Sequence, residues 1–407
     1  MTKMLKTCIG VGALLLAALT APAQAYQCES DFCGSNGCMT GCGVSSLYFA
    51  GGHADFGLYG NNHGQRNVYD LRDAPGEKWN PNSGNTIALG PARHADLQMN
   101  QLYGFFGKKL NKRGWDIGGR MDFLYGTDAY FTQSNGLEYF TSPNNSPAAD
   151  RDRWGKGDYL ASFPQAYGEI GYCNLSVKLG KFYTPLNGDA IMSPNRFFYS
   201  TSYAFGQLPM TQTGAVATWD INPCLSAYGG WTNGEEPAGP LSDSTFANAK
   251  NNAALFGFDY KVRKFSLGYG ILMGKGENNV GNHDFDYFAH SFVIGYKPNR
   301  CWDYTFQWVL RNNNDDWGAG ADATAAYGIN QELIYKLNRC WAFGGRFEWM
   351  RMQDADFYEF TLGTNYTPNN WLVVRPEIRW DHSNEEYFAM GDSKNQFGFG
   401  VSTILKF

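Results

Sequence analysis

The residues of this chain that could do chemistry are not spaced as a common catalytic site requires. The sequence has no G-x-S-x-G turn, no H-E-x-x-H zinc motif and no glycine-rich phosphate loop. Two histidines have a carboxylate close by in sequence, because His53 precedes Asp55 and His382 follows Asp381. Either pair could assist a nucleophile, but a solvated histidine in a loop or a lumen is the more ordinary explanation. We therefore expect no enzyme and no cofactor.

Metal binding is a second kind of chemistry to consider. The segments 283–287 (HDFDY) and 312–317 (NNNDDW) offer carboxylate oxygens, which are the ligands that Ca²⁺ prefers. Exposed loops are commonly acidic, however, so the composition alone does not indicate a site. We expect no metal site.

Cysteines are the third reactive group, and their number suggests disulfides. When Cys8 is set aside with the export signal described below, eight of the 9 cysteines remain, an even number in an oxidising compartment. They are Cys28, Cys33, Cys38, Cys42, Cys173, Cys224, Cys301 and Cys340.

The first four of these cysteines lie in a glycine-rich leader and the last four lie in or beside tight turns. Pairs between leader and turns would tether the leader beneath the turns. Pairs between consecutive turns are less favourable, because such hairpins lie about 10 Å apart and a disulfide needs Cα atoms within about 7 Å. Links between copies of the chain remain open, and so does a metal site on the leader, although its spacing lacks the C-x₂-C pairs of zinc sites.

Charged residues form the largest set with a shared pattern, since they alternate with apolar residues along strand-like segments. They are Arg120, Asp122, Glu169, Asp259, Arg311, Glu332, Arg346, Glu348, Arg375, Glu377 and Arg379. In a membrane strand each charge facing hydrocarbon would cost about 2–4 kcal/mol, so we expect this face to line a wet lumen. Opposed rows of charge in a pore screen solutes by charge. The alternative is that these residues form ion pairs that only stiffen the wall.

The elements that position these residues are predicted to be strands. The chain carries 49 Gly, 25 Tyr, 29 Phe and 12 Trp but only 17% charged residues, a composition typical of short aromatic-rich strands. The net charge of −5 argues against a nucleic-acid partner. Lys3 and Lys6, the apolar run 9–19 and Ala23-Gln24-Ala25 predict a signal peptide over residues 1–25. We expect a Cys/Gly-rich periplasmic leader over 26–45 and a barrel domain over 46–407.

Sixteen alternating segments follow from Leu47 onward, each about nine to thirteen residues long, as expected of tilted membrane strands. Their connections alternate between long and short. The long ones cover 61–96, 127–163, 184–210, 234–250, 275–285, 312–325 and 382–395, with MQDAD (352–356) as a shorter member of this set. The short ones include KPNRC (297–301), KLNRC (336–340) and TPNN (367–370). This pattern predicts an all-β, transmembrane antiparallel barrel of about 16 strands.

Aromatic residues recur beside the tight turns. YKPNRCW, YKLNRCW and YTPNNW share one frame, which predicts a belt of Tyr and Trp at one membrane interface. The alternative is that these residues only form the hairpin turns, since Pro and Asn favour turns in any protein. The chain ends GVSTILKF, an apolar alternating strand that would promote aggregation as a free edge, so we expect it to pair with the first strand. Its last residue, Phe407, resembles the terminal signal of outer-membrane barrels.

The run GKFYTPLNGDAIMSPNRFFYSTSYAFGQLPMTQTGAVATW (180–219) resembles the motif region of the OmpL-like porins, the beta-barrel porin-2 family. The resemblance extends from about residue 46 to the end of the chain and implies a pore-forming outer-membrane protein. The connection 184–210 joins strands five and six, and in general porins this connection folds into the lumen. It is rich in Phe, Tyr, Met and Pro, so we expect it to narrow the pore, with Arg196 and Asp189 as its charged members. A plug or a subunit contact is the alternative.

The expected function is an outer-membrane porin that passes small hydrophilic solutes or ions by passive diffusion. Its expected partners are outer-membrane lipid, the solutes themselves and, by resemblance, two further copies in a homotrimer. One alternative is a structural envelope protein cross-linked by disulfides, with the barrel as its anchor. A soluble secreted β protein is the other.

Overall fold

The computed structural model describes residues 47–64, 94–134, 137–140, 151–152, 155–156, 159–233, 252–278, 283–315, 324–352, 355–389 and 391–407. The expected signal peptide and leader lie outside the described residues. So do the long stretches 65–93 and 234–251 in the connections after the first and seventh wall strands.

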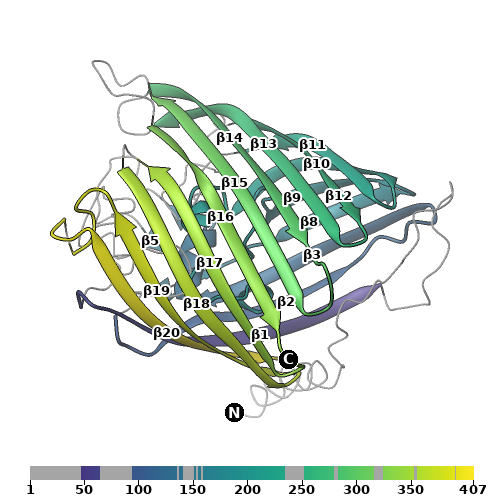
Figure 1. The fold of residues 1–407 in the computed structure, drawn as a ribbon. Helices are drawn as coiled ribbons and strands as arrows, with labels where there is room; N and C mark the ends of the chain where they lie inside the picture. The colour runs from purple at the N-terminus through teal and green to yellow at the C-terminus, as the bar shows by residue number, and fades with distance from the viewer. Residues whose placement is uncertain are drawn as a thin grey trace, which may run out of the picture.

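Antiparallel strands form a closed wall (Figure 1). The sheet holds 18 strands, of which the short β6 (Gly155–Lys156) and β7 (Tyr159–Ser162) are additions near β3, and the others make a barrel of sixteen. The wall strands are β1 (Tyr48–Asn61), β2 (Gln98–Lys108), β3 (Trp115–Gly126), β8 (Ala166–Tyr172), β9 (Leu175–Tyr183), β10 (Thr211–Asn222), β11 (Leu225–Thr232), β12 (Asn252–Val262), β13 (Phe265–Asn278), β14 (His283–Tyr296), β15 (Trp302–Asp315), β16 (Thr324–Lys336), β17 (Trp341–Met352), β18 (Ala355–Asn369), β19 (Leu372–Ser383) and β20 (Asn395–Lys406).

Short elements occupy two of the connections. Between β3 and β8 lie the 3₁₀ turn η1 (Thr127–Thr132) and the two-residue strands β4 (Tyr139–Phe140) and β5 (Arg151–Asp152). Between β9 and β10 lie η2 (Ser193–Asn195) and the single-turn helix α2 (Tyr203–Gly206). Across the described part of the chain, every helix is too short or too polar to cross a membrane.

The first and last strands close the barrel. β1 pairs antiparallel with β20 from His53↔Lys406 to Asn61↔Gly398, so the purple and yellow strands of Figure 1 lie side by side. Phe407 extends this seam, because its amide nitrogen donates to Gly52 O at 2.9 Å and its carbonyl accepts from Gly52 N at 2.8 Å. The apolar end of the chain is therefore paired, and the barrel has no free edge at this seam.

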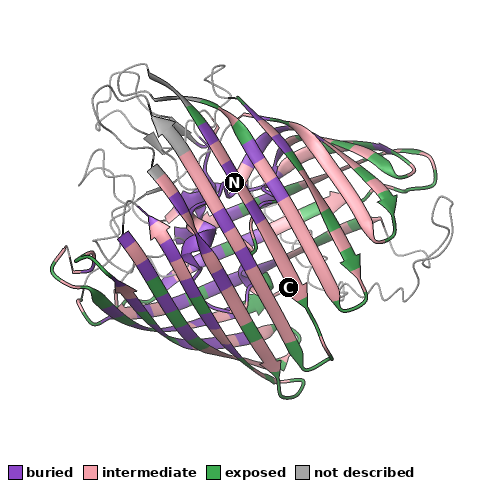
Figure 2. Ribbon diagram, turned by 45° about the horizontal axis from the view of Figure 1, so that its top comes forward, coloured by how far each residue is buried: buried purple, intermediate pink, exposed green. Residues whose placement is uncertain are grey.

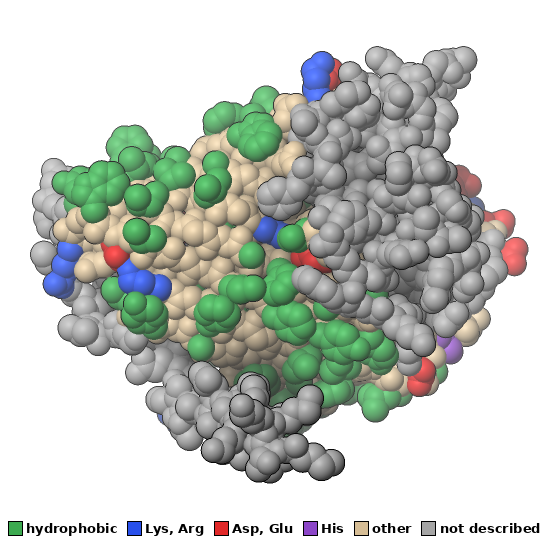
Figure 3. Space-filling model, turned by 180° about the vertical axis from the view of Figure 1, so that it is seen from behind, with side chains coloured by type: hydrophobic (Ala, Val, Ile, Leu, Met, Phe, Trp, Pro, Cys, Tyr) green, Lys and Arg blue, Asp and Glu red, His purple; other side chains and the backbone are tan. Residues whose placement is uncertain are grey.

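Side-chain alternation gives the wall a lipid face and an inner face. Along β9, Leu175, Val177 and Leu179 are 49%, 39% and 66% exposed, whereas Ser176 and Lys178 point to the other side. Figure 2 shows the same banding along most strands, and Figure 3 shows hydrophobic side chains spread over the outer wall between the rims. A strand with period-two hydrophobicity can sit in a bilayer only in this orientation.

The two ends of the barrel differ as the sequence predicts. Every hairpin at the end that carries Phe407 is a tight turn, while the longer connections lie at the opposite end. Several strands continue further than expected: β13 reaches Asn278 and β14 starts at His283, although 275–285 reads as a loop. These extensions contain Gly, Asn and acidic residues on both faces, because beyond the bilayer neither face needs to be apolar. The sequence therefore shows no alternation there that would predict a strand.

The two acidic segments considered for Ca²⁺ fall in these extensions. Phe285 of β14 pairs with Asp315 of β15, so 283–287 and 312–315 lie on neighbouring strands, while 316–317 lie outside the described residues. Among the described residues, no group of three or more His, Cys, Asp or Glu side chains is arranged to hold a metal ion.

Candidate functional site: the loop across the barrel interior

The connection 184–210 between β9 and β10, here called the inner loop, packs against the inner face of the barrel. Leu186, Tyr199, Phe205 and Leu208 are each at most 1% exposed. Two wall glycines allow its rings to approach closely, because a Cβ at Gly57 would collide with the Tyr199 ring and one at Gly344 with Phe197. The rings therefore lie directly on the wall, and the loop is part of the interior.

A belt of charged residues on β16–β19 faces the inner loop. In the sheet register Glu332 lies opposite Arg346, and Glu348 lies opposite Glu359, which in turn lies opposite Asp381. Three acids in one row repel one another, since like charges directly opposite in a sheet are destabilising. Arginines two residues along the strands, on the same face, offset this repulsion: Arg346 Nε lies 2.9 Å from Glu359 Oε2, and Arg379 Nε lies 2.9 Å from Asp381 Oδ1.

The arginines of the belt also bind carbonyl groups of the inner loop. Arg346 Nη1 donates to Ser200 O at 2.8 Å, and Arg379 Nη1 donates to Thr201 O at 2.8 Å. Arg375 Nη1 lies within 3.2 Å of the carbonyl oxygens of Ser193, Arg196 and Phe198. Each guanidinium thus joins a wall strand to the loop backbone, which a planar group with five donors does well.

The acids of the belt accept the amide hydrogens of the inner loop. Glu377 accepts from Tyr199 N at 2.8 Å and from Ser200 N at 3.0 Å. Glu348 accepts from Tyr203 N at 2.5 Å and from Ala204 N at 2.6 Å. A buried loop outside regular secondary structure must find partners for its backbone groups, and these carboxylates supply them.

Two loop tyrosines complete this side of the site. Tyr203 donates its hydroxyl to Asp381 Oδ1 at 2.6 Å, and Tyr199 donates to Asn100 Oδ1 at 3.1 Å. Burial raises the pKa of both hydroxyls well above the ordinary value, so both remain protonated donors.

A second polar cluster holds the start of the inner loop against β1–β3. Arg196 Nη2 lies 3.3 Å from Asp128 Oδ2 of η1, and Gln101 Nε2 donates to Ile191 O at 2.7 Å. Arg120 Nε lies 2.6 Å from Asp122 Oδ1, and Asp122 also accepts from the Tyr103 hydroxyl.

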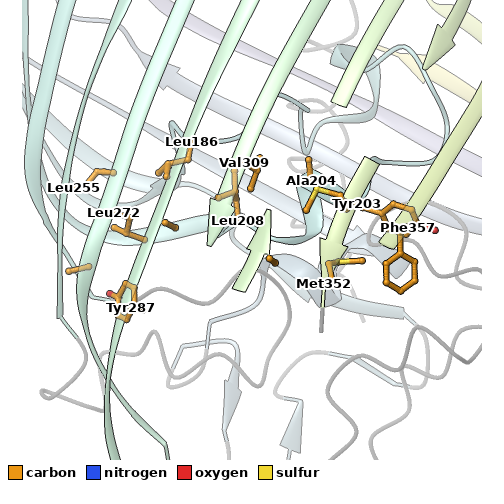
Figure 4. Packing of buried hydrophobic residues seen from close by; sticks show 14 of the residues in the cluster. Leu186, Tyr203, Ala204, Leu208, Leu255, Leu272, Tyr287, Val309, Met352 and Phe357 are labelled. Carbon is orange, nitrogen blue, oxygen red and sulfur yellow. The ribbon is translucent and has the colours of Figure 1, made fainter. Parts of the chain in front are cut away.

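On the other side the loop meets an apolar wall. Leu186, Leu208 and Ala204 pack in one cluster with Leu255 of β12, Leu272 of β13 and Val309 of β15, all fully or almost fully buried (Figure 4). The inner loop is therefore held by charges on one side of the barrel and by apolar contacts on the other. Both kinds of contact fix its position across the interior.

The structure divides the expected lumen residues into two groups. Those buried to 7% exposure or less are Asp122, Arg196, Arg346, Glu348, Arg375, Glu377 and Arg379. The more exposed members are Arg120, Glu169, Asp189, Arg311 and Glu332, which are of intermediate exposure, and Asp259, which is exposed. The buried group is engaged with the inner loop and with neighbouring charges. Asp189 itself accepts from Ser202 N and Oγ within the loop.

Three further charged residues of the site were not among the expected lumen residues. Asp55 lies 3.2 Å from Arg375, Glu359 pairs with Arg346, and Asp128 pairs with Arg196. Asp381, considered only beside His382, belongs to the belt. Alternation with Arg379 would have placed Asp381 on the inner face, whereas nothing in the sequence places Asp128 beside the loop.

The two histidines considered for catalysis are held by amide side chains. His53 Nε2 lies 2.7 Å from Gln101 Oε1, and its buried ring stacks on Tyr103. His382 Nδ1 lies 3.0 Å from Asn395 Oδ1 at the exposed rim.

Four candidate disulfide cysteines lie in or beside the tight turns. Cys173 joins β8 to β9, Cys224 joins β10 to β11, Cys301 joins β14 to β15 and Cys340 joins β16 to β17. The other four, Cys28, Cys33, Cys38 and Cys42, lie outside the described residues, and the pairing of the eight stays a prediction.

The expected aromatic belt lies at the same end. The rings of Trp302 and Tyr335 pack in a tilted arrangement with their centroids 4.7 Å apart, and those of Trp341 and Tyr366 do so at 4.4 Å. Trp341 and Trp371 are 40% and 54% exposed on the outer wall, where a ring with one polar edge suits a membrane interface.

Known structures with this arrangement are outer-membrane proteins. OmpT of Vibrio cholerae, solved in a trimer form, superposes with a TM-score of 0.54 and 11% identity over 88% of this chain and 99% of that chain. The outer-membrane channel DcaP of Acinetobacter baumannii gives 0.57 and 10% over 88% and 97%, respectively. An anion-selective porin from Comamonas acidovorans gives 0.55 and 9% over 88% and 99%. At such identities the likeness shows the fold.

Comparison with curated protein sequences gave no match. The sequence profile described as "Putative beta-barrel porin-2, OmpL-like" matches residues 76–407, which is most of the chain and includes the inner loop and its belt. A porin family indicates a channel in the outer membrane. The chain belongs to the OmpL-like beta-barrel porin-2 family.

Proposed function

We propose that this porin lets small hydrophilic solutes and ions cross the outer membrane by passive diffusion, with the inner loop as its constriction. The observation that carries the proposal is the loop itself, which is fixed across the interior by buried charges on one side and apolar contacts on the other. A loop without contacts to the wall would move in solvent and would not keep the pore at one size. Held in this way, it sets a constant cross-section.

The two groups of charges take different parts in this proposal. The buried arginines and acids of β17–β19 position the inner loop. The more exposed inward charges act on solutes, and they lie on the opposite wall and at its margins: Arg120, Glu169, Asp259 and Arg311. Asp259 is the most exposed of these residues. A unit charge about 4 Å from a passing ion changes its energy by about 1 kcal/mol in water, enough to change the local ion concentration about fivefold.

Planar bilayers containing the purified protein test the channel directly. We expect current steps of uniform size that scale with salt concentration. In a salt gradient, Asp259→Asn should move the reversal potential toward anion preference, because it removes a negative charge from the pathway while keeping the side-chain volume. Asp392→Asn, at an exposed position in the connection between β19 and β20, is the matched control and should leave it unchanged.

A bilayer that stays silent at high protein load would contradict the channel. In that case disulfide-linked multimers on non-reducing gels would favour the structural envelope protein. Unchanged ion preference in Asp259→Asn alone would contradict only the part assigned to this residue.

The trimer is a further part of the proposal. It is supported by the trimer form of the Vibrio cholerae OmpT, which shares the fold. Native mass spectrometry in detergent that gives three chains would support it, and a monomer alone would contradict it.

A further inference from the structure

The rim formed by the tight turns is strongly basic, although the chain as a whole carries a net charge of −5. Exposed lysines and arginines occupy most of these turns and the strand ends beside them: Lys109, Lys112, Arg113, Lys261, Arg263, Lys264, Lys297, Arg300, Lys336 and Arg339. We call this set, together with its four cysteines, the basic rim.

Few acids offset this charge within the described turns and the strand ends beside them. Asp220 pairs with Lys112, Asp303 lies 2.7 Å from Lys297, and Asp116 is bound by Lys108 at 2.6 Å. The terminal carboxylate of Phe407 also lies at this end. The rim therefore keeps an excess of positive charge, and it would attract an anionic segment.

The segment of this chain that precedes the barrel has the opposite charge. Residues 26–46 contain Glu29 and Asp31 and no lysine or arginine. They also contain four cysteines, and the basic rim contains four more. The segment joins the barrel at the rim itself, because Leu47 O accepts from Lys109 N at 2.9 Å.

One rim cysteine gives independent support. Cys224 is disulfide-bonded, whereas Cys301 and Cys340 carry free thiols. The leader supplies four cysteines that could bond to it.

We propose that the basic rim is the docking surface of the chain's own leader, residues 26–45, which is held there by opposite charge and locked by at least one disulfide to Cys224. The lengths allow it. A barrel of sixteen strands is about 30 Å across. An extended chain covers at most about 3.5 Å per residue, so from Leu47 the sulfur of Cys42 reaches about 17 Å and that of Cys28 about 65 Å. The proposal rests on the expected signal cleavage and not on channel activity.

Mass spectrometry of the non-reduced, full-length protein tests the disulfide. Equal amounts of ¹⁵N-labelled and unlabelled protein are expressed separately, then mixed, reduced, reoxidised and digested. We expect a peptide pair that joins the leader to the Cys224 turn, with both peptides carrying the same isotope. Mixed-isotope pairs only, or a thiol at Cys224 in every molecule, would overturn the proposal.

A charge-reversal variant tests the docking. The double variant Arg113→Glu and Arg263→Glu alters two turns that contain no cysteine. The rim cysteines and the turns that carry them are therefore unchanged. Reoxidation should form the leader–Cys224 pair about fivefold more slowly than in the unmodified protein, because one unit charge about 4 Å away changes the energy by about 1 kcal/mol in water.

Lys275→Glu with Lys394→Glu, which reverses two exposed charges at the other end of the barrel, is the matched control and should reoxidise at the original rate. Equal rates in both variants would show that rim charge does not recruit the leader. The readout is disulfide formation in folded protein, so a channel that fails to conduct would not affect the result.

Discussion

Arg346, Arg375 and Arg379 each bind an acid of the barrel wall and the backbone of the inner loop at the same time. Their side chains are at most 2% exposed, so their role depends on complete pairing. Removing one partner of a buried charge pair costs about 3–5 kcal/mol, since the other charge is left without compensation. At the scale of single residues, a charge that alternation places on the inner face can therefore hold the inner loop in position and not act on a solute.

Glu377→Gln tests this role of the belt. The amide keeps the shape of the side chain but can accept only one of the two hydrogen bonds from Tyr199 N and Ser200 N, and each buried bond to a charged group contributes about 1.5–3 kcal/mol. We expect larger and noisier single-channel currents and faster proteolysis within 184–210 in detergent. Glu386→Gln, at an exposed position near β20, is the control. Currents of unchanged size and noise in Glu377→Gln would show that the belt does not hold the loop.

At the scale of elements, the repeated turn motif has a common geometry. Asn338 Oδ1 accepts from Cys340 N at 2.8 Å and Trp341 N at 2.9 Å, and Asn299 makes the same pair of bonds to Cys301 N and Trp302 N. Asn222 and Asn369 repeat it in two further turns. The asparagine side chain thus replaces a backbone acceptor and fixes the start of the next strand.

Replacing Asn338 separates this bonding from simple turn composition. Asn338→Ala removes both hydrogen bonds and should lower the free energy of unfolding by about 1–2 kcal/mol. Asn338→Asp keeps the acceptor oxygen and should retain most of the stability. The measurement is the urea midpoint in detergent micelles, followed by tryptophan fluorescence. Equal losses in the two variants would assign the effect to the backbone and not to the acceptor.

The strands and turns were predictable because their signals are local. Period-two alternation can be read from neighbouring residues. The tight turns can be read in the same way, from an Asn that lies between two aromatic residues, as in YKPNRCW and YKLNRCW. The strand extensions to Asn278 and Asp315 were missed because outside the bilayer no alternation is required. The partners of Arg375 could not be predicted, since Ser193, Arg196 and Phe198 reach it only through the tertiary path of the inner loop.

At the scale of the whole molecule, the barrel depends on the seam between β1 and β20. Nine residue pairs form it, from His53↔Lys406 to Asn61↔Gly398, and they join residues more than 330 positions apart. Such contacts form late, because the loop-closure entropy must be overcome before they contribute. Until the seam is closed, both edge strands expose unpaired backbone groups, which hydrocarbon does not tolerate.

Deletion of Phe407 should therefore affect closure more than its size suggests. It removes the two hydrogen bonds with Gly52 at the end of the seam and the ring that lies against that glycine. We expect a smaller fraction of heat-modifiable, folded protein on unboiled gels after refolding into micelles, whereas Phe407→Tyr keeps the backbone bonds and a ring and should refold normally. Phe397→Ala removes a 57% exposed ring on the outer wall of the same strand and controls for lost lipid contact. If the deletion and Phe397→Ala refold equally well, Phe407 does not contribute to closing the barrel.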